Sequence, residues 1–260
     1  MPDELKILFI GDIVGKPGRK VFSYFIPSLI EKYKTDLVIV NMENIAGGFG
    51  ITVKTYRELE NLADVFTSGN HVWDKKETLE NIDEMQKLLR PLNVHPSLPG
   101  RKYKILKIKG VRVLVTNLLG RVFMKPIDDP FQTIDNLLQE IEAEVKIIDF
   151  HAEATSEKEA MGWYLNGRVT AVVGTHTHVQ TADERILSKD TAYITDVGMT
   201  GSLDGIIGFK KEEVIEKIVY GIPKRLETCK TNLHLNGVFI KCNLEGKAHS
   251  IKRIDEVMKD

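Results

Sequence analysis

Short apolar runs alternate with amphipathic stretches along most of the chain. The runs predict strands that are buried on both faces, where successive positions are apolar. Helical patterns begin near Pro17, a residue that suits a first helical turn, and at Thr52. Pro27 should kink or split the first helix, because proline lacks a backbone N–H and its ring clashes with the preceding turn. The strands predicted from this pattern are 7–10, 37–40, 65–67, 145–150, 169–173 and 192–195.

Two antiparallel hairpins complete the pattern. Residues 102–108 and 111–117 form the first, and apolar positions alternate with more polar ones in its second segment, which indicates one more deeply buried face. The other hairpin is predicted over residues 233–254. Parallel and antiparallel strands with helices outside them predict an α/β protein of two packed sheets, each covered by helices, in a single domain over residues 1–260. Further helices are predicted over 131–141, 157–161 and 211–220.

Composition and charge narrow the class of protein. Hydrophobic residues make up 42% of the chain and charged residues 28%, as in soluble globular proteins. The formal net charge of −1 argues against a dedicated nucleic-acid surface, which would carry a basic excess. The apolar runs are far shorter than the ~20 residues of a membrane helix, so we expect a cytoplasmic protein with no membrane partner. Cys229 and Cys242 are too few for a disulfide framework and are expected to be inert thiols.

Side chains that commonly bind metals follow five of the predicted strands. In α/β folds the carboxyl ends of the strands form the rim where ligands bind, so these residues should converge. Oxygen and imidazole donors without thiolates favour Mn, Fe, Zn or Co. The set is too large for one four-coordinate ion, and two metals about 3.5–4 Å apart that share a carboxylate would use it naturally. The clusters are Asp12, Glu43-Asn44, Asn70-His71, His151 and His176 with His178.

Each cluster taken alone has an ordinary explanation. A Gly-Asp pair after a strand commonly forms a turn. His176 and His178 would face the same side of a continuing strand, yet such a pair could equally be hydrogen-bonded within a loop. The glycine-rich segments 15–19 and 47–50 match no phosphate-binding motif, and the second is interpreted as a flap or a turn beside Glu43. The five clusters together are what indicates a dinuclear site. The histidines that lack such surroundings are predicted to lie on the surface or to pack, and they are His95, His234 and His249.

The ordered clusters resemble those of the calcineurin-like metallophosphoesterases, and more closely those of their YmdB-like branch. The segments that carry the resemblance are 9–15, 70–74, 149–156, 176–183 and 193–201. The resemblance implies a four-layer α/β/β/α sandwich of two mixed sheets and phosphodiesterase activity on 2′,3′-cyclic nucleotides such as 2′,3′-cAMP. It departs from the wider superfamily at Val14, where a histidine ligand is usual, and at Glu43, where a bridging aspartate is usual.

The YmdB-like pattern accounts for both departures, because it implies that Glu43 bridges the metals and that the Asn44 amide oxygen takes the vacant place. One metal would then be held by Asp12, Glu43, Asn44 and His178. The other would be held by Glu43, Asn70, His151 and His176.

The hypothesis that follows is in-line attack of a metal-bridging hydroxide on a small phosphodiester, with His71 as the general acid. Two divalent ions, two carboxylates and a hydroxide leave a formal charge of about +1, which suits a monoanionic diester. The alternative for His71 is simple packing. The alternatives for the protein are a phosphomonoesterase or RNA-end hydrolase on the same site, or a nucleotide-binding regulator with little turnover. A homo-oligomer is compatible with the sequence. No aromatic clamp is readable near the clusters, so the nucleobase is expected to matter little.

Overall fold

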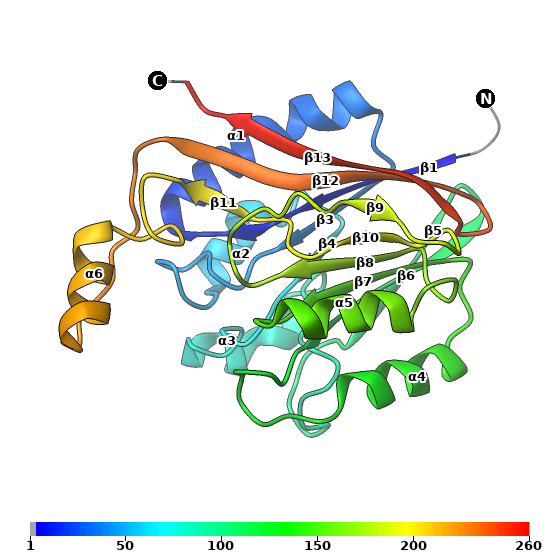
Figure 1. Cartoon of the computed structure of the whole chain (residues 1–260), viewed down its shortest axis with the longest axis horizontal. Helices are drawn as coiled ribbons and strands as arrows, with labels where there is room; N and C mark the ends of the chain where they lie inside the picture. The colour runs from blue at the N-terminus through cyan, green and yellow to red at the C-terminus, as the bar shows by residue number, and fades with distance from the viewer. Residues whose placement is uncertain (1–3, 260) are drawn as a thin grey trace.

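Two mixed β-sheets pack face to face in the computed structural model, which describes residues 4–259 (Figure 1). In spatial order the first sheet contains β2 (Asp12–Ile13), β11 (Met199–Ser202), β12 (Leu233–Asn243), β1 (Glu4–Ile10), β3 (Leu37–Asn41) and β4 (Val65–Thr67), with β13 (Ala248–Val257) paired to β12. The second sheet contains β5 (Tyr103–Ile108), β6 (Val111–Leu119), β7 (Val145–His151), β8 (Ala171–Thr175), β10 (Ala192–Ile194) and β9 (Arg185–Ile186). Parallel pairing of β1, β3 and β4, and of β6, β7, β8 and β10, aligns the carboxyl ends of these strands at one rim.

Helices cover the outer face of each sheet, which confirms the predicted four-layer α/β/β/α sandwich. The elements are α1 (Gly15–Tyr33), α2 (Val53–Leu59), α3 (Lys76–Asn81), the 3₁₀ turn η1 (Ile82–Glu84), α4 (Pro130–Glu140), α5 (Thr155–Tyr164) and α6 (Lys211–Tyr220). Figure 1 shows α4 and α5 along the second sheet, and α6 set apart from the sandwich. No helix within residues 4–259 is long and apolar enough to cross a membrane.

Three apolar layers hold the sandwich together, and strand β1 shows how the sequence builds them. Its side chains alternate: Leu8 and Ile10 pack under α1 and α2, whereas Ile7 and Phe9 pack between the two sheets. A third layer fills the space between the second sheet and helices α4 and α5. The continuous apolar run in β1 therefore reflects burial on both faces, as the sequence predicts.

Local sequence signals were correct at the start of α2 and incomplete elsewhere. Thr52 caps α2 in a capping box with Thr55, as expected for the first residue of this helix. Helix α1 runs through Pro27 as a single element, so the proline does not split it. The sequence missed β2, β9 and β11, because two to four residues are too few to show a period.

The two cysteines have different surroundings. Cys242 is buried, and burial raises the pKa of its thiol to about 12. Cys229 is partly exposed. Burial alone would raise the pKa of Cys229, but hydrogen bonds from Ser202 and Thr231 lower it. Only Cys242 therefore fits the expected inert thiol.

Candidate functional site

The predicted ligand-type side chains meet at the rim where the carboxyl ends of both sheets come together. Asp12 lies in β2, directly after β1, and Glu43 and Asn44 follow β3. Asn70 follows β4. The second sheet supplies the imidazoles: His151 ends β7, and His176 and His178 follow β8. The topology thus brings together residues that are up to 166 positions apart in the sequence.

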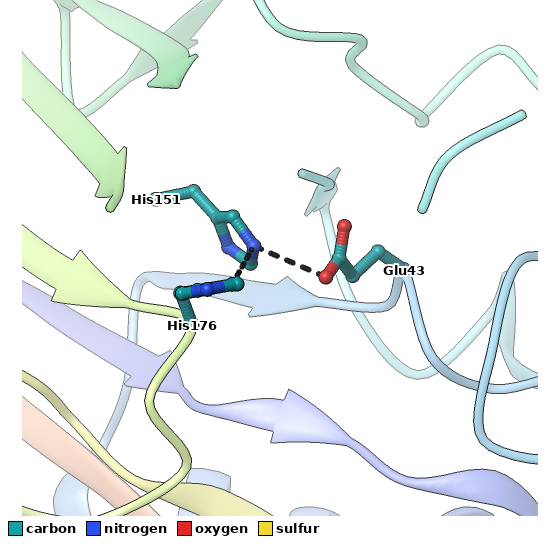
Figure 2. A group of neighbouring side chains, drawn as sticks. All are labelled: Glu43, His151 and His176. Atoms are coloured by element: carbon teal, nitrogen blue, oxygen red, sulfur yellow. Dashed lines mark hydrogen bonds and ion pairs between the residues drawn. The ribbon is translucent and has the colours of Figure 1, made fainter. Parts of the chain in front are cut away.

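One half of the cluster converges on the Nε2 atom of His151. Figure 2 shows Glu43 and His176 pointing toward this ring. The distances from His151 Nε2 are 3.1 Å to Glu43 Oε1, 3.1 Å to Asn70 Oδ1 and 3.0 Å to His176 Nδ1. One ring nitrogen can donate or accept only one hydrogen bond. Three polar atoms at this distance are therefore arranged as ligands around a shared cation would be.

The other half surrounds His178. Its Nε2 atom lies 3.3 Å from Asn44 Nδ2 and 3.7 Å from Asp12 Oδ1. Its Nδ1 atom is 3.0 Å from the backbone oxygen of Ile207, and donation there leaves Nε2 with a free lone pair. The Oδ1 atoms of Asp12 and Asn44 are buried and have no hydrogen-bond partner among the described residues. Buried orphan oxygens are costly, so these two atoms fit a bound cation.

Glu43 lies between the two halves. Its Oε1 atom contacts His151 Nε2 and accepts a hydrogen bond from Asn44 Nδ2 at 3.3 Å. Its Oε2 atom accepts the backbone N–H of His71 at 2.9 Å. The preceding Gly69 permits this approach, because a Cβ atom there would lie 2.4 Å from Glu43 Oε2 and 2.3 Å from His151 Nε2. The Glu43 carboxylate is therefore placed to serve both halves of the cluster.

Opposite charges in the cluster shift the pKa values of its buried carboxyl groups and imidazoles. Burial alone would raise the pKa of Asp12, but the neighbouring imidazoles of His178 and His151 lower it to about 2. Burial likewise opposes ionisation of Glu43, yet His151 holds the pKa of that carboxyl below its usual range. Burial would lower the pKa of His151, but Glu43 and Asp12 raise it to about 9. Burial together with the charge of His151 lowers the pKa of His176 to about 3. The acids are therefore ionised at neutral pH, as metal binding requires.

A second set of residues orients the imidazoles, and its role has no signal in the sequence. Thr175 Oγ1 donates to buried Asp149 at 2.7 Å and lies 2.9 Å from His151 Nδ1. Because a hydroxyl carries one proton, Thr175 accepts the Nδ1–H, so Nε2 is the nitrogen that faces the cluster. Burial raises the pKa of Asp149 to about 7. Glu153 Oε2 lies 3.0 Å from His176 Nε2, which directs His176 Nδ1 toward His151.

His176 and His178 lie in a loop and not on an extension of strand β8. The sequence argument that they face the same side of a strand is therefore wrong, although both reach the site. Strand β8 ends at Thr175, and the two histidines have φ angles of 100° and 65°. Left-handed backbone is unfavourable for such side chains. Asp196 holds the residue between them by accepting hydrogen bonds from Thr177 N at 2.9 Å and Thr177 Oγ1 at 2.7 Å. Both histidines reach the site through this constrained turn.

A cavity of about 260 Å³ opens over the cluster. His71 lies at its edge and not among the imidazoles, with its Nδ1 atom 2.7 Å from Asp74 Oδ2. The Nε2 atom of His71 has no hydrogen-bond partner within residues 4–259. Phe49 packs edge-on to His71, with ring centroids 5.0 Å apart. A Cβ atom at Gly48 would meet Phe209 at 2.4 Å, so the turn is packed against Phe209 at Gly48, whereas Gly47 is exposed.

The remaining histidines lie outside the cluster, as predicted. His95 is exposed and pairs with Ser97. His234 and His249 contact Asp255 and Glu4.

A four-layer α/β/β/α sandwich of two mixed sheets is the fold of the calcineurin-like metallophosphoesterases. Within that class, the family described as "YmdB-like protein" matches residues 8–254, and the chain belongs to this family. The chain is 49% identical over 254 residues to the 2′,3′-cyclic-nucleotide 2′-phosphodiesterase of Bacillus subtilis strain 168, covering 96% of each chain.

Two crystal structures share the fold along nearly their whole length. One is a hypothetical protein from Thermus thermophilus, with a TM-score of 0.93, 38% identity, and coverage of 98% of this chain and 100% of that one. The other is described as a novel phosphatase from Mycoplasma pneumoniae, with a TM-score of 0.94, 36% identity, and coverage of 99% and 95%.

Proposed function

We propose that this chain is a metal-dependent phosphodiesterase that hydrolyses 2′,3′-cyclic nucleotides. The observation that carries the proposal is the buried carboxylate and imidazole cluster with two orphan oxygens, on Asp12 and Asn44. The 49% identity to a relative named as a 2′,3′-cyclic-nucleotide 2′-phosphodiesterase supports this substrate class.

The two halves of the cluster suit two divalent ions, such as Fe, Mn or Zn, because oxygen and imidazole donors favour these metals. Glu43 would bridge them, since its Oε1 atom faces both His151 and Asn44. The first ion would be held by Asp12, Glu43, Asn44 and His178. The second would be held by Glu43, Asn70, His151 and His176, of which Glu43, His151 and His176 place ligand atoms within 4.8 Å of one another.

A metal pair, when bound, supplies hydroxide near neutral pH and neutralises charge on the phosphoryl oxygens. The chain's own residues set the orientation of this chemistry. Thr175 and Glu153 fix the rings of His151 and His176 before any ligand arrives. Asp12 and Glu43, ionised and buried, place two negative charges under the cavity. A monoanionic diester matches the small positive charge that remains after two divalent ions and a hydroxide are added.

Hydrolysis of the cyclic ester forms one new P–O bond, breaks one ring P–O bond and leaves a ribose oxygen that needs a proton. His71 is the proposed donor. Asp74 holds its Nδ1 atom, which leaves Nε2 as the nitrogen that can exchange a proton with a group in the cavity. Because His71 contacts Glu43 only through its backbone N–H, its ring is free for this role.

Initial rates under one metal condition test the proposal. We expect kcat/KM for 2′,3′-cAMP at least ~10-fold above that for 3′-AMP or 5′-AMP, a difference of about 1.4 kcal/mol in transition-state binding. Monoesters that turn over equally fast would favour a phosphatase, and a short oligoribonucleotide turning over fastest would favour an RNA-end hydrolase. Tight nucleotide binding without turnover above buffer containing the same metal would favour a regulator. Each of these outcomes would overturn the proposed activity.

A further inference from the structure

A second cavity, of about 530 Å³, opens beside the candidate metal site. Gly69 and Asn70 line it, and Asn70 Oδ1 is the same atom that lies 3.1 Å from His151 Nε2. Asp74, which holds His71, also lines it. The turn from Gly69 to Asp74 therefore has the ionic cluster on one side and this larger cavity on the other.

The walls of the second cavity are mostly apolar. They include Trp73, Val94, Leu98, Met124 and Ile127. Charged groups, Lys125 and Asp128, also line it. An apolar pocket of about 300–1,000 Å³ with a few polar groups is typical of small-molecule sites.

Buried side chains fix the far wall, so the cavity is already formed. Asn93, which is 1% exposed, donates from Nδ2 to the backbone oxygens of Leu119 at 2.8 Å and Asp128 at 3.1 Å. Glu157 accepts the backbone N–H groups of Arg121 at 2.9 Å and Val122 at 3.2 Å. The loop between β6 and α4 is thus anchored near both of its ends, and Met124 and Ile127 stand on it.

The smaller cavity cannot also receive a nucleoside. Its volume of about 260 Å³ is about half that of the second cavity and must accommodate the phosphate and the metal ions. An aromatic side chain in that lining, Phe49, already stacks on Phe209 with ring centroids 4.9 Å apart and an interplanar angle of 15°. A substrate with its phosphate over the cluster must therefore extend elsewhere.

We propose that the second cavity receives the nucleobase of the substrate, with the base against Trp73 and Met124. The inference rests on the proposed function for the phosphate site, because a cyclic nucleotide joins a phosphate to a flat aromatic base. The size and apolar walls favour a purine. Trp73 also corrects the expectation that no aromatic group is available to the base near the clusters.

Binding of adenosine tests the cavity without any catalysis. The sequence has two tryptophans, Trp73 and Trp163, and Trp163 is exposed on α5. In a Trp163→Phe background Trp73 is the remaining reporter. We expect adenosine to change its fluorescence in a saturable manner, and Met124→Ala to weaken that binding about 10-fold. Val122→Ala, on the same loop but outside the cavity lining, should leave binding unchanged.

Kinetics with two cyclic esters separate this inference from the function on which it rests. Met124→Ala and Trp73→Leu should raise KM for 2′,3′-cAMP about 10-fold more than they raise KM for the base-free glycerol 1,2-cyclic phosphate. Wild-type protein inactive on both esters would overturn the proposed function. Wild-type activity with an unaltered KM in both variants would overturn the base site, as would a fluorescence titration in which adenosine has no effect on Trp73.

Discussion

Replacing Asp196 by asparagine should both destabilise the protein and loosen the loop that carries His176 and His178. The Asp196 side chain is fully buried and pairs with Lys158 Nζ at 2.7 Å, and Lys158 itself is only 1% exposed. Asp196 Oδ2 also accepts both Thr177 hydrogen bonds, and its Oδ1 atom accepts the Gly198 N–H at 2.9 Å. Asparagine keeps the shape but leaves the Lys158 ammonium buried without a counter-charge.

The expected loss follows from this geometry. Removing one partner of a buried ion pair costs about 3–5 kcal/mol in the free energy of unfolding. For a chain of this size about 1 kcal/mol shifts Tm by roughly 2–4 °C, so Tm should fall by about 6–20 °C. The same substitution exchanges an acceptor for a donor at Thr177, between two residues with left-handed backbone. Metal affinity should therefore fall as well.

Urea unfolding followed by circular dichroism gives the stability, and calorimetric metal titration of the folded protein gives the affinity. The double variant Lys158→Met, Asp196→Asn is the matched control, because it removes the unpaired charge but not the defect at Thr177. It should recover most of the stability and keep the weakened metal binding. An Asp196→Asn protein within about 1 kcal/mol of wild type would refute the assignment of an energetically important buried pair. Full recovery of metal affinity in the double variant would refute the positioning role.

Three further predictions concern the candidate site and the thiols. Elemental analysis should find about two transition-metal ions per wild-type chain, and one ion or none would contradict this. Glu43→Gln should weaken metal binding at both sites because it removes the proposed bridging carboxylate. His71→Ala should keep the metals and lower kcat roughly 10²–10⁴-fold. The loss should be smaller on p-nitrophenyl esters, whose leaving group needs no proton. Loss of a metal ion in this variant would show that His71 is a ligand. In native protein a disulfide reagent should label Cys229 and spare Cys242 until unfolding, because burial raises the pKa of Cys242 to about 12; equal labelling would contradict the buried setting.

The sequence predicted those parts of the fold in which burial produces a repeating pattern. Strands β1 and β3 contain runs of successive apolar residues because both faces are covered, and the side chains that follow these runs converge at one rim. Short strands such as β2 and β11 form by pairing with a neighbouring strand, β2 with β11 and β11 with the amino-terminal end of β12, so their own residues carry no signal. The histidine pair was found, but through a period-two argument that the backbone of His176 does not obey.

Residues that support the ligands escaped prediction for a different reason. Thr175 and Asp149 resemble ordinary polar residues of a strand, and nothing in their spacing shows that one hydroxyl links His151 to a buried acid. Asp196 is 19 positions from Thr177 and shares no local pattern with it. A supporting role that depends only on a tertiary contact produces no repeating pattern in the sequence, so the sequence alone does not predict it.

The division of ligand types between the sheets connects the fold to the chemistry. The oxygen donors stand on the first sheet, and the imidazoles stand on the second. Neither sheet alone has a complete set, so the site forms only where the apolar layer between the sheets sets their separation. Glu43 and His151 meet across that boundary at 3.1 Å, although each is buried and would be costly without the other. The same packing that buries the apolar core therefore places buried carboxylates against imidazoles, as the proposed metal site requires.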